Sequence, residues 1–140
     1  MKSYVVDASV VAKCFIDEPY SDKASEVIDA HAKGHLSLSA PSIIVYELGN
    51  IFWRHPRITS EKAYEFIGKF LDLHIGLVDV WSDAGLLKSA CAISKTRSLT
   101  FYDSSYLAMV ERDRVKLVTA DEYLRNKAPN LVVLLKEFKG

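Results

Sequence analysis

Four acidic residues stand at places in the sequence from which their side chains could meet. Asp7 directly follows the apolar run YVV, and Asp121 follows the run KLVT after a single residue. Asp103 stands at the start of one expected helix, and Glu47 lies early in another. Taken singly, the three aspartates are typical of helix N-caps, where a carboxylate accepts hydrogen bonds from free backbone N–H groups. The residues TADE at 119–122 also have the form of a capping box, which offers Asp121 a purely structural role.

Glu47 is harder to explain as a structural residue. Its neighbours at i−4, i−3 and i+4 are all isoleucines, so the helical period of 3.6 residues puts its side chain in the middle of an apolar face. A lone carboxylate on such a face would have a large desolvation cost. We therefore expect a cationic partner for it, either a base such as Lys13 or Arg54, or a metal ion.

The elements that must position these acids alternate between strands and helices. Continuous apolar runs such as YVV are typical of strands buried on both faces. Alternating strands and helices predict an α/β fold, here a three-layer α/β/α sandwich with a central parallel sheet of four to five strands. The helices expected at 41–54 and 59–74 follow one another as a paired insertion, with Pro41 in the first turn of the former. We expect strands at 4–7, 36–40, 77–80, 115–119 and 131–135, further helices at 9–16, 21–32, 83–94, 103–110 and from 121, and a loop at 96–101.

Parallel strands bring their carboxyl ends to one edge of the sheet, where binding sites form. Asp7 and Asp121 should meet at this edge, with Glu47 reaching the same rim and Asp103 facing it. Four converging carboxylates would repel one another strongly unless hard divalent cations with oxygen ligands offset their charge. Such a cluster predicts an Mg²⁺ or Mn²⁺ site that could activate a water molecule and stabilise the leaving oxygen of a phosphodiester.

Length and charge restrict the alternatives. The chain has 140 residues, 49% of them apolar, which suits one domain over residues 1–140 with a sizeable core. Lys+Arg and Asp+Glu both total 18, so the formal net charge is zero. This balance argues against an indiscriminate nucleic-acid binder, which would be basic, and leaves room for an enzyme that meets nucleic acid through a small site.

The two cysteines and the hydropathy pattern indicate the compartment. Cys14 and Cys91 stand alone, without the spacing of a zinc site, and suit a reducing cytoplasm. No signal peptide and no apolar stretch of membrane-spanning length is evident, so we expect a cytoplasmic protein without a membrane segment. The histidines are interpreted as surface or packing residues rather than ligands: His31, His35, His55 and His74.

Four motifs in order carry a family resemblance. The stretches VVDASVVAKCF, APSIIVYELGNIFWR, LTFYDSSYLAMV and LVTADEYL together resemble a PIN domain, specifically the VapC-like toxins of prokaryotic toxin–antitoxin pairs. The resemblance runs from Tyr4 to about Leu135. It implies a small α/β/α fold and an Mg²⁺- or Mn²⁺-dependent endoribonuclease that acts on single-stranded RNA.

The resemblance also implies roles for individual residues. The family's acidic quartet corresponds to Asp7, Glu47, Asp103 and Asp121, with Asp7 and Asp103 as the principal metal ligands and the other two completing the pocket. Its supporting polar positions correspond to Ser9, Asn50 and Thr119, which would orient the carboxylates.

Two bases and an aromatic helix pair suggest contacts with partners. Lys13 and Arg97 could each meet an RNA phosphate, although a solvated or salt-bridged base is an equally good interpretation of Arg97. Phe52, Trp53, Phe66 and Phe70 are interpreted first as core residues and second as the surface for a homodimer through 41–54 and 59–74. The resemblance adds a small antitoxin protein that docks nearby as a helix in a groove.

Two other classes of protein remain as alternatives. In a phosphate-accepting receiver domain Asp79 would be the acceptor, with Thr119 and Lys136 assisting, but that site needs an acidic pair at the tip of the first strand, where only Asp7 stands. A phosphatase of the Asp-x-Asp type is disfavoured because Ser9 replaces the second aspartate. The other alternative is a catalytically silent PIN-like binding module, against which the intact quartet counts.

Overall fold

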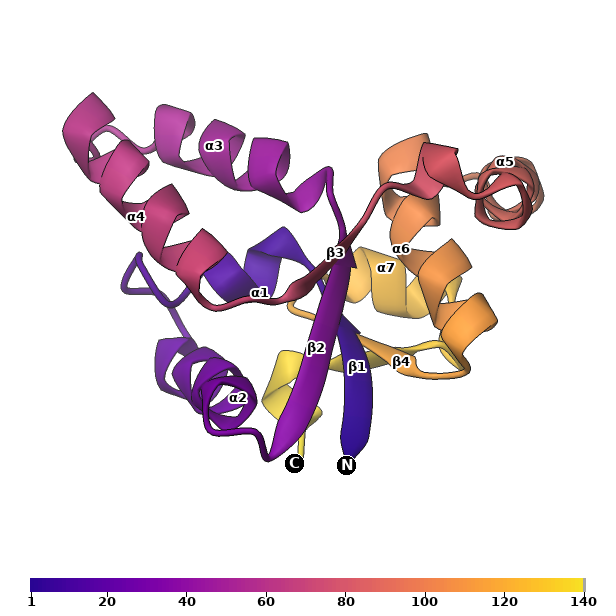
Figure 1. Ribbon diagram of the computed structural model, residues 1–140, viewed down its shortest axis with the longest axis horizontal. Helices are drawn as coiled ribbons and strands as arrows, with labels where there is room; N and C mark the ends of the chain where they lie inside the picture. Colours follow the sequence, from indigo (N-terminus) through magenta and orange to yellow (C-terminus); the bar gives the residue numbers. More distant parts are fainter. Residues whose placement is uncertain (140) are drawn as a thin grey trace.

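The computed structural model describes residues 1–139 and contains a five-stranded sheet in which all neighbouring strands are parallel (Figure 1). The strand order is β3-β2-β1-β4-β5, so β1 lies at the centre. This confirms the predicted α/β fold with four to five parallel strands. The strands are β1 (Lys2–Val6), β2 (Leu36–Pro41), β3 (Gly76–Val78), β4 (Lys116–Thr119) and β5 (Val132–Leu134).

Helices cover both faces of the sheet. Figure 1 shows α1 and α2 on one side and α5 and α6 on the other, while α3 and α4 form a hairpin beyond the carboxyl end of β2. The predicted paired insertion is therefore confirmed. The helices are α1 (Ala8–Ala12), α2 (Ser21–Ala32), α3 (Ile44–Arg54), α4 (Ser60–Asp72), α5 (Ala84–Arg97), α6 (Phe101–Asp113) and α7 (Glu122–Lys127), with 3-10 turns η1 (Val80–Ser82) and η2 (Leu135–Glu137).

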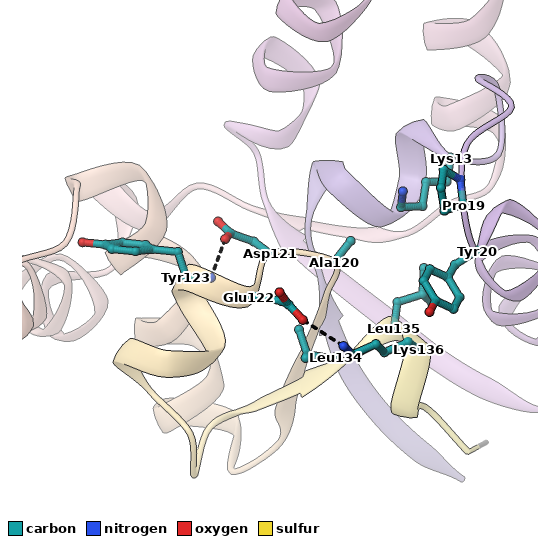
Figure 2. Close-up of a pocket in the computed structure, with 10 residues that line it drawn as sticks. All are labelled: Lys13, Pro19, Tyr20, Ala120, Asp121, Glu122, Tyr123, Leu134, Leu135 and Lys136. Carbon is teal, nitrogen blue, oxygen red and sulfur yellow. Dashed lines mark hydrogen bonds and ion pairs between the residues drawn. The ribbon is translucent and has the colours of Figure 1, made fainter.

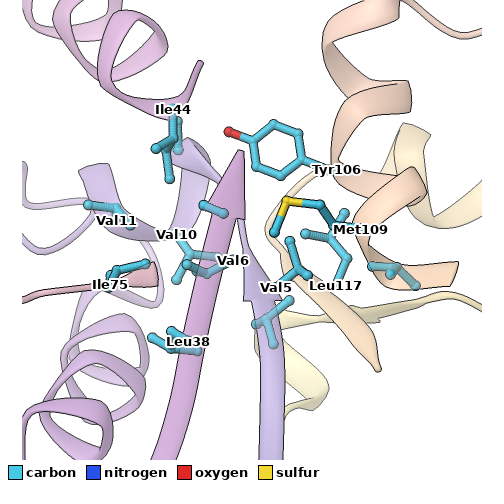
Figure 3. Close-up of a cluster of buried hydrophobic side chains, with 14 of the residues drawn as sticks. Val5, Val6, Val10, Val11, Leu38, Ile44, Ile75, Tyr106, Met109 and Leu117 are labelled. Atoms are coloured by element: carbon cyan, nitrogen blue, oxygen red, sulfur yellow. The ribbon is translucent and has the colours of Figure 1, made fainter. Parts of the chain in front are cut away.

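The core lies on both sides of the central strand. Val5 and Val6 are completely buried because β1 has a strand on each side and helices over each face. Leu38, Ile44 and Leu117 pack around them (Figure 3). The continuous apolar run at the start of the chain thus fits a doubly covered strand, and it ends at the residue before Asp7.

Several element boundaries differ from those predicted. Pro41 closes β2 opposite Val78 instead of opening a helix, so α3 begins only at Ile44 and Glu47 lies in its first turn. Asp103 is not an N-cap, because Thr100 takes that position and accepts the backbone N–H of Asp103 at 3.1 Å. The expected helix 9–16 ends at residue 12, the expected strand 77–80 splits into β3 and η1, and half of the expected loop 96–101 belongs to α5 and α6.

The strand order also separates this fold from that of a receiver domain. Receiver domains have the order 2-1-3-4-5, with the third strand at the centre. Here β3 is a three-residue edge strand, so Asp79, which follows it, lies away from the central strand that Asp7 follows. The receiver alternative is therefore wrong.

Across residues 1–139, none of the helices combines the length and the hydropathy needed to traverse a bilayer. Both cysteines are free thiols, with Cys14 half-buried and Cys91 exposed on α5. Burial raises the pKa of the Cys14 thiol to about 11.

Candidate active site

The four acidic residues line one pocket at the carboxyl edge of the sheet. Its volume is about 240 Å³, and its remaining wall comes from Ala8, Ser9, Asn50, Ile51 and Tyr106. Asp7 comes from the end of β1 and Asp121 from the turn after β4, while Glu47 and Asp103 come from the first turns of α3 and α6. The structure therefore brings together the four acids that the sequence singled out.

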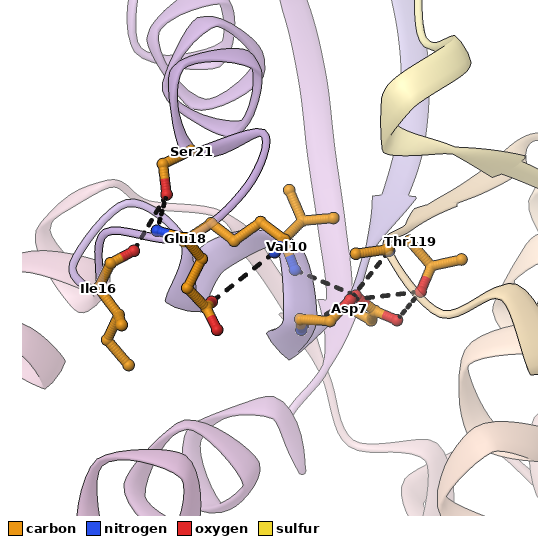
Figure 4. A network of polar contacts seen from close by, with 9 residues as sticks. Asp7, Val10, Ile16, Glu18, Ser21 and Thr119 are labelled. Atoms are coloured by element: carbon orange, nitrogen blue, oxygen red, sulfur yellow. Dashed lines mark hydrogen bonds and ion pairs between the residues drawn. The ribbon is translucent and has the colours of Figure 1, made fainter. Parts of the chain in front are cut away.

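Asp7 is buried and held by four hydrogen bonds (Figure 4). Its Oδ1 accepts the backbone N–H groups of Ser9 at 3.1 Å and Val10 at 3.4 Å, which caps α1, and the Ser9 hydroxyl at 2.6 Å. Its Oδ2 accepts the hydroxyl of Thr119. Burial nevertheless raises the pKa of Asp7 to about 6, because desolvation outweighs these hydrogen bonds, and the like charge of Glu47 raises the pKa further.

Two hydroxyl groups join the ends of β1 and β4. The backbone N–H of Ala120 donates to Ser9 Oγ at 3.0 Å, and that of Asp121 donates to Thr119 Oγ1 at 3.1 Å. Because the same two hydroxyls donate to Asp7, they fix its position relative to Asp121. Asp121 caps α7 by accepting two backbone N–H groups, and Thr119, fully buried beside Asp7, does not form the capping box that its spacing suggested.

Glu47 has a neutral hydrogen-bond partner and not the lysine or arginine that was one of its two expected partners. The hydroxyl of Tyr106 donates to Glu47 Oε1 at 2.6 Å. Lys13 Nζ lies 3.7 Å from Glu18 instead, and Arg54 is exposed at the other end of α3. Burial raises the pKa of Glu47, the hydrogen bond from Tyr106 opposes this, and the charge of Asp103 adds to it. The salt-bridge alternative for Glu47 is therefore wrong, and the metal alternative stays a prediction.

Tyr106 is the residue of this pocket that the sequence reasoning missed. It is 1% exposed, and both burial and the nearby charge of Glu47 raise its pKa, so its hydroxyl keeps its proton. It lies three residues after Asp103 on α6, on the same face of that helix. The i, i+3 spacing from Asp103 was the feature of the sequence that could have identified Tyr106 as a pocket residue.

The pocket suits a hard divalent cation in its chemistry, although its acids are not drawn together into a ready-made cage. Burial raises the pKa of Asp103, and the charge of Asp121 raises it further. Within residues 1–139 no three carboxylate, imidazole or thiol groups lie close enough to form a preformed metal site. The carboxylates repel one another, and Asp7, Glu47 and Asp121 are each held by their own hydrogen bonds. The donor set is entirely oxygen, which matches Mg²⁺ or Mn²⁺ better than softer metals.

The other sequence candidates fall in three places. Ser9 and Asn50 line the pocket, and Thr119 supports Asp7 from behind. Lys13 lines a neighbouring pocket that also includes Asp121. Arg97 lies elsewhere, because its guanidinium donates to the carbonyl of Lys127 at 3.0 Å at the end of α7. The structural interpretation of Arg97 is the one that this contact supports.

Comparisons with known proteins identify the family and agree with the fold. The family model described as PIN domain matches residues 4–129. Ribonuclease VapC3 of Pyrobaculum aerophilum is 33% identical over 132 residues, which are 91% of this chain and 96% of that protein. The crystal structure of PAE2754 from Pyrobaculum aerophilum is similar at a TM-score of 0.70 and 26% identity, covering 96% of this chain and 92% of that one.

A further solved structure shares the fold at lower identity. It is VapBC2 from Rickettsia felis bound to a DNA fragment from its promoter, with a TM-score of 0.70 and 14% identity over 94% of this chain and 98% of that one. These matches span nearly the same residues as the four sequence motifs.

Proposed function

This chain belongs to the PIN domain family, and we propose that it is an Mg²⁺- or Mn²⁺-dependent endoribonuclease of the VapC type, the toxin of a toxin–antitoxin pair. The observation that carries the proposal is the single pocket lined by Asp7, Glu47, Asp103 and Asp121 at the carboxyl edge of the sheet. The relative at 33% identity is a ribonuclease by name, and it matches this chain over almost its whole length. The proposal treats residues 1–140 as one nuclease domain that acts in the cytoplasm.

The four acidic residues would have different roles in binding the cation. Asp7 and Asp103 would be the principal ligands of the cation, and Glu47 and Asp121 would complete the pocket. When bound, the cation supplies an activated water molecule and positive charge for the leaving oxygen of a phosphodiester. Tyr106 keeps Glu47 turned into the pocket through its 2.6 Å hydrogen bond. Asn50 is exposed at the rim, where its amide can donate to a phosphate or ribose oxygen.

The hydroxyls behind Asp7 would keep it in place whatever its charge. Ser9 and Thr119 donate to its two carboxylate oxygens and are themselves fixed by the backbone of the turn after β4. Asp7 and Asp121 therefore stay at a set separation without a cation between them. This rigidity is what a site needs if substrate positioning is to contribute to catalysis.

The decisive experiment is cleavage of single-stranded RNA by the purified protein. We expect products with Mg²⁺ or Mn²⁺, none in EDTA, and none or very little from Asp103→Asn in either metal. Circular dichroism of the variant controls for folding. A wild-type protein that leaves RNA intact with both metals, or an Asp103→Asn variant that cuts at nearly the wild-type rate, would overturn the proposal.

The proposal also includes binding of partners through α3 and α4. The aromatic residues that would form the contact surface differ from those named from the sequence. Phe52 and Phe70 are core residues and Phe66 packs on Phe52 with ring centroids 5.5 Å apart, so the aromatic load of the helix pair is mostly internal. The exposed aromatic residues of α3 and α4 are Tyr46, Trp53 and Tyr64. We place the homodimer and antitoxin contacts on this surface. A monomeric mass by light scattering at tens of micromolar protein would exclude the homodimer.

A further inference from the structure

A second pocket opens directly beside the acidic one, and Asp121 lines both (Figure 2). Its volume is about 530 Å³, within the range of about 300–1,000 Å³ found for small-molecule sites. Its walls come from the segment between α1 and α2, from η2 and from the turn after β4. They include Lys13, Pro19, Tyr20, Leu135, Lys136 and Asp121. The two pockets therefore adjoin at Asp121.

Lys13 gives this pocket a cation with unused hydrogen-bonding capacity. Its side chain is only 13% exposed, so most of it is removed from water. The nearest carboxylate oxygen, Glu18 Oε1, lies 3.7 Å from Nζ, which is beyond hydrogen-bonding distance. An ammonium group can donate three hydrogen bonds. Figure 2 shows it directed toward the side of the pocket where Asp121 lies. An anionic oxygen entering the pocket would meet it.

Tyr20 gives the pocket an aromatic wall that folding alone does not explain. Its φ of +69° is a left-handed conformation, which is an outlier for a bulky residue. Tyr20 occupies the N-cap of α2, but its side chain makes no capping hydrogen bond. Asparagine would tolerate the positive φ better and could also cap the helix. The Tyr20 side chain is 52% exposed, beside Leu135 and Lys136. Strain of this kind tends to persist at functional sites.

The rest of the pocket is fixed and close to neutral. Lys136 Nζ pairs with Glu122 Oε1 at 2.8 Å, and its carbonyl accepts Lys23 Nζ at 3.0 Å. With Asp121, Glu122 and Glu18 nearby, a peptide rich in acidic side chains would be repelled. One phosphate at Lys13 and one flat, uncharged base on Tyr20 match the pocket better. A contact of this size also agrees with a chain whose net charge is zero.

We propose that this pocket binds the nucleotide next to the cleaved phosphodiester, with its base stacked on Tyr20 and its phosphate at Lys13, so that the substrate must be unpaired at this position. The inference rests on the proposed ribonuclease function and specifies its substrate class. A base inside a duplex is stacked on its neighbours and cannot reach Tyr20. Stacking on an aromatic side chain is tolerant of sequence, because every base has an aromatic face.

The test uses two variants with matched controls. Tyr20→Asn removes the ring while suiting the positive φ and the N-cap, and Lys13→Met keeps the buried stem while removing the charge. Trp81→Asn removes an aromatic ring and Lys33→Met removes a charge at exposed positions outside the pocket. Each protein is given a single-stranded RNA of about a dozen nucleotides, for cleavage kinetics in Mg²⁺ and for fluorescence anisotropy with Ca²⁺ in place of Mg²⁺.

We expect Tyr20→Asn to raise KM and the dissociation constant about tenfold or more with kcat little changed, as loss of one stacked base predicts. Lys13→Met should weaken binding and lower the slope of log affinity against log salt by about 0.7, the value for one phosphate of a single strand. The two controls should match the wild type. An abasic nucleotide next to the mapped cleavage site should remove the effect of Tyr20→Asn, and a duplex of the same sequence should resist cleavage.

Each other result has a distinct meaning. If the wild type cleaves RNA and both pocket variants behave like their controls, the pocket proposal is overturned and the ribonuclease stands. If RNA binding depends on Tyr20 and Lys13 but nothing is cleaved, the pocket stands and the ribonuclease fails. Absence of RNA binding overturns both. A polyglutamate peptide that binds through these two residues, while RNA binding ignores them, assigns the pocket to a protein partner instead.

Discussion

Asp7→Asn should stabilise the metal-free protein at neutral and alkaline pH while removing most of its ribonuclease activity. Asp7 is buried, with all its hydrogen bonds supplied by the protein and no cationic group among its partners. Asparagine keeps the shape and the cap of α1, since its Oδ1 can accept the same two backbone N–H groups. The Thr119 hydroxyl can rotate to accept from the new amide. The variant therefore removes a buried charge and little else.

The size of the effect follows from the pKa. Burial raises the pKa of Asp7 from 3.8 to about 6. At about 1.4 kcal/mol for each factor of ten in the dissociation constant, this difference corresponds to about 3 kcal/mol. Because the folded pKa is the higher one, the stability that protonated Asp7 contributes is fully present below pH 3.8 and is lost as pH rises through about 6. Asparagine never ionises, so the variant should keep that stability at every pH.

Urea unfolding in EDTA between about pH 4 and pH 8 measures the prediction directly. The free energy of unfolding of Asp7→Asn should exceed that of the wild type by up to about 3 kcal/mol near pH 8, and the two should converge near pH 4. Asp17→Asn is the matched control, because Asp17 is exposed at the end of the segment after α1. A difference that does not change with pH, or a variant that is less stable near pH 8, would refute the view that Asp7 is a strained, desolvated carboxylate.

Four further predictions concern three other side chains and the pH dependence of cleavage. Tyr106→Phe should lower the free energy of unfolding by about 1–3 kcal/mol, because Glu47 loses the hydrogen bond that Tyr106 donates at 2.6 Å, and should raise the Mg²⁺ concentration for half-maximal cleavage. Asp121→Ala should cost about 1 kcal/mol more stability than Asp121→Asn, which keeps the cap of α7, while both lose activity. His31→Ala should cost about 1–3 kcal/mol in urea unfolding but leave cleavage intact, since His31 accepts the N–H of Leu38 far from the pocket. Cleavage at subsaturating Mg²⁺ should fall as pH drops through about 6, where protonation of Asp7 competes with the cation, and excess Mg²⁺ should shift this fall to lower pH.

Local patterns predicted the elements well where burial and periodicity agreed. The run YVV predicted a strand covered on both faces, and it lies in β1 at the centre of the sheet. The alternation of strands and helices was enough to predict the parallel sheet. Pro41 shows the limit of local rules. Proline suits the first turn of a helix, but Pro41 instead ends β2 opposite the short edge strand β3, where pairing between strands decides the boundary.

The candidate site was predictable in its acids and not in their partners. The positions of Asp7 and Asp121 follow from strand ends, which can be located from the sequence. The partner of Glu47 is 59 residues away on α6, and only the folded chain brings its hydroxyl to 2.6 Å. Thr119 has the spacing of a capping box, yet its hydroxyl serves Asp7, 112 residues earlier in the chain. Tertiary hydrogen bonds override local signals at such places.

The site is thus arranged to hold negative charges near one another without neutralising them. No lysine or arginine lines the acidic pocket among the described residues, and Lys13 lines the adjoining pocket together with Asp121. Neutral hydroxyls of Ser9, Thr119 and Tyr106 fix the carboxylates. A salt bridge would fix them equally well, but it would also occupy the charge that a divalent cation needs. Neutral donors leave that charge available, at the cost of the raised pKa values, and under the proposed function the stability given up in this way would be regained when the cation binds.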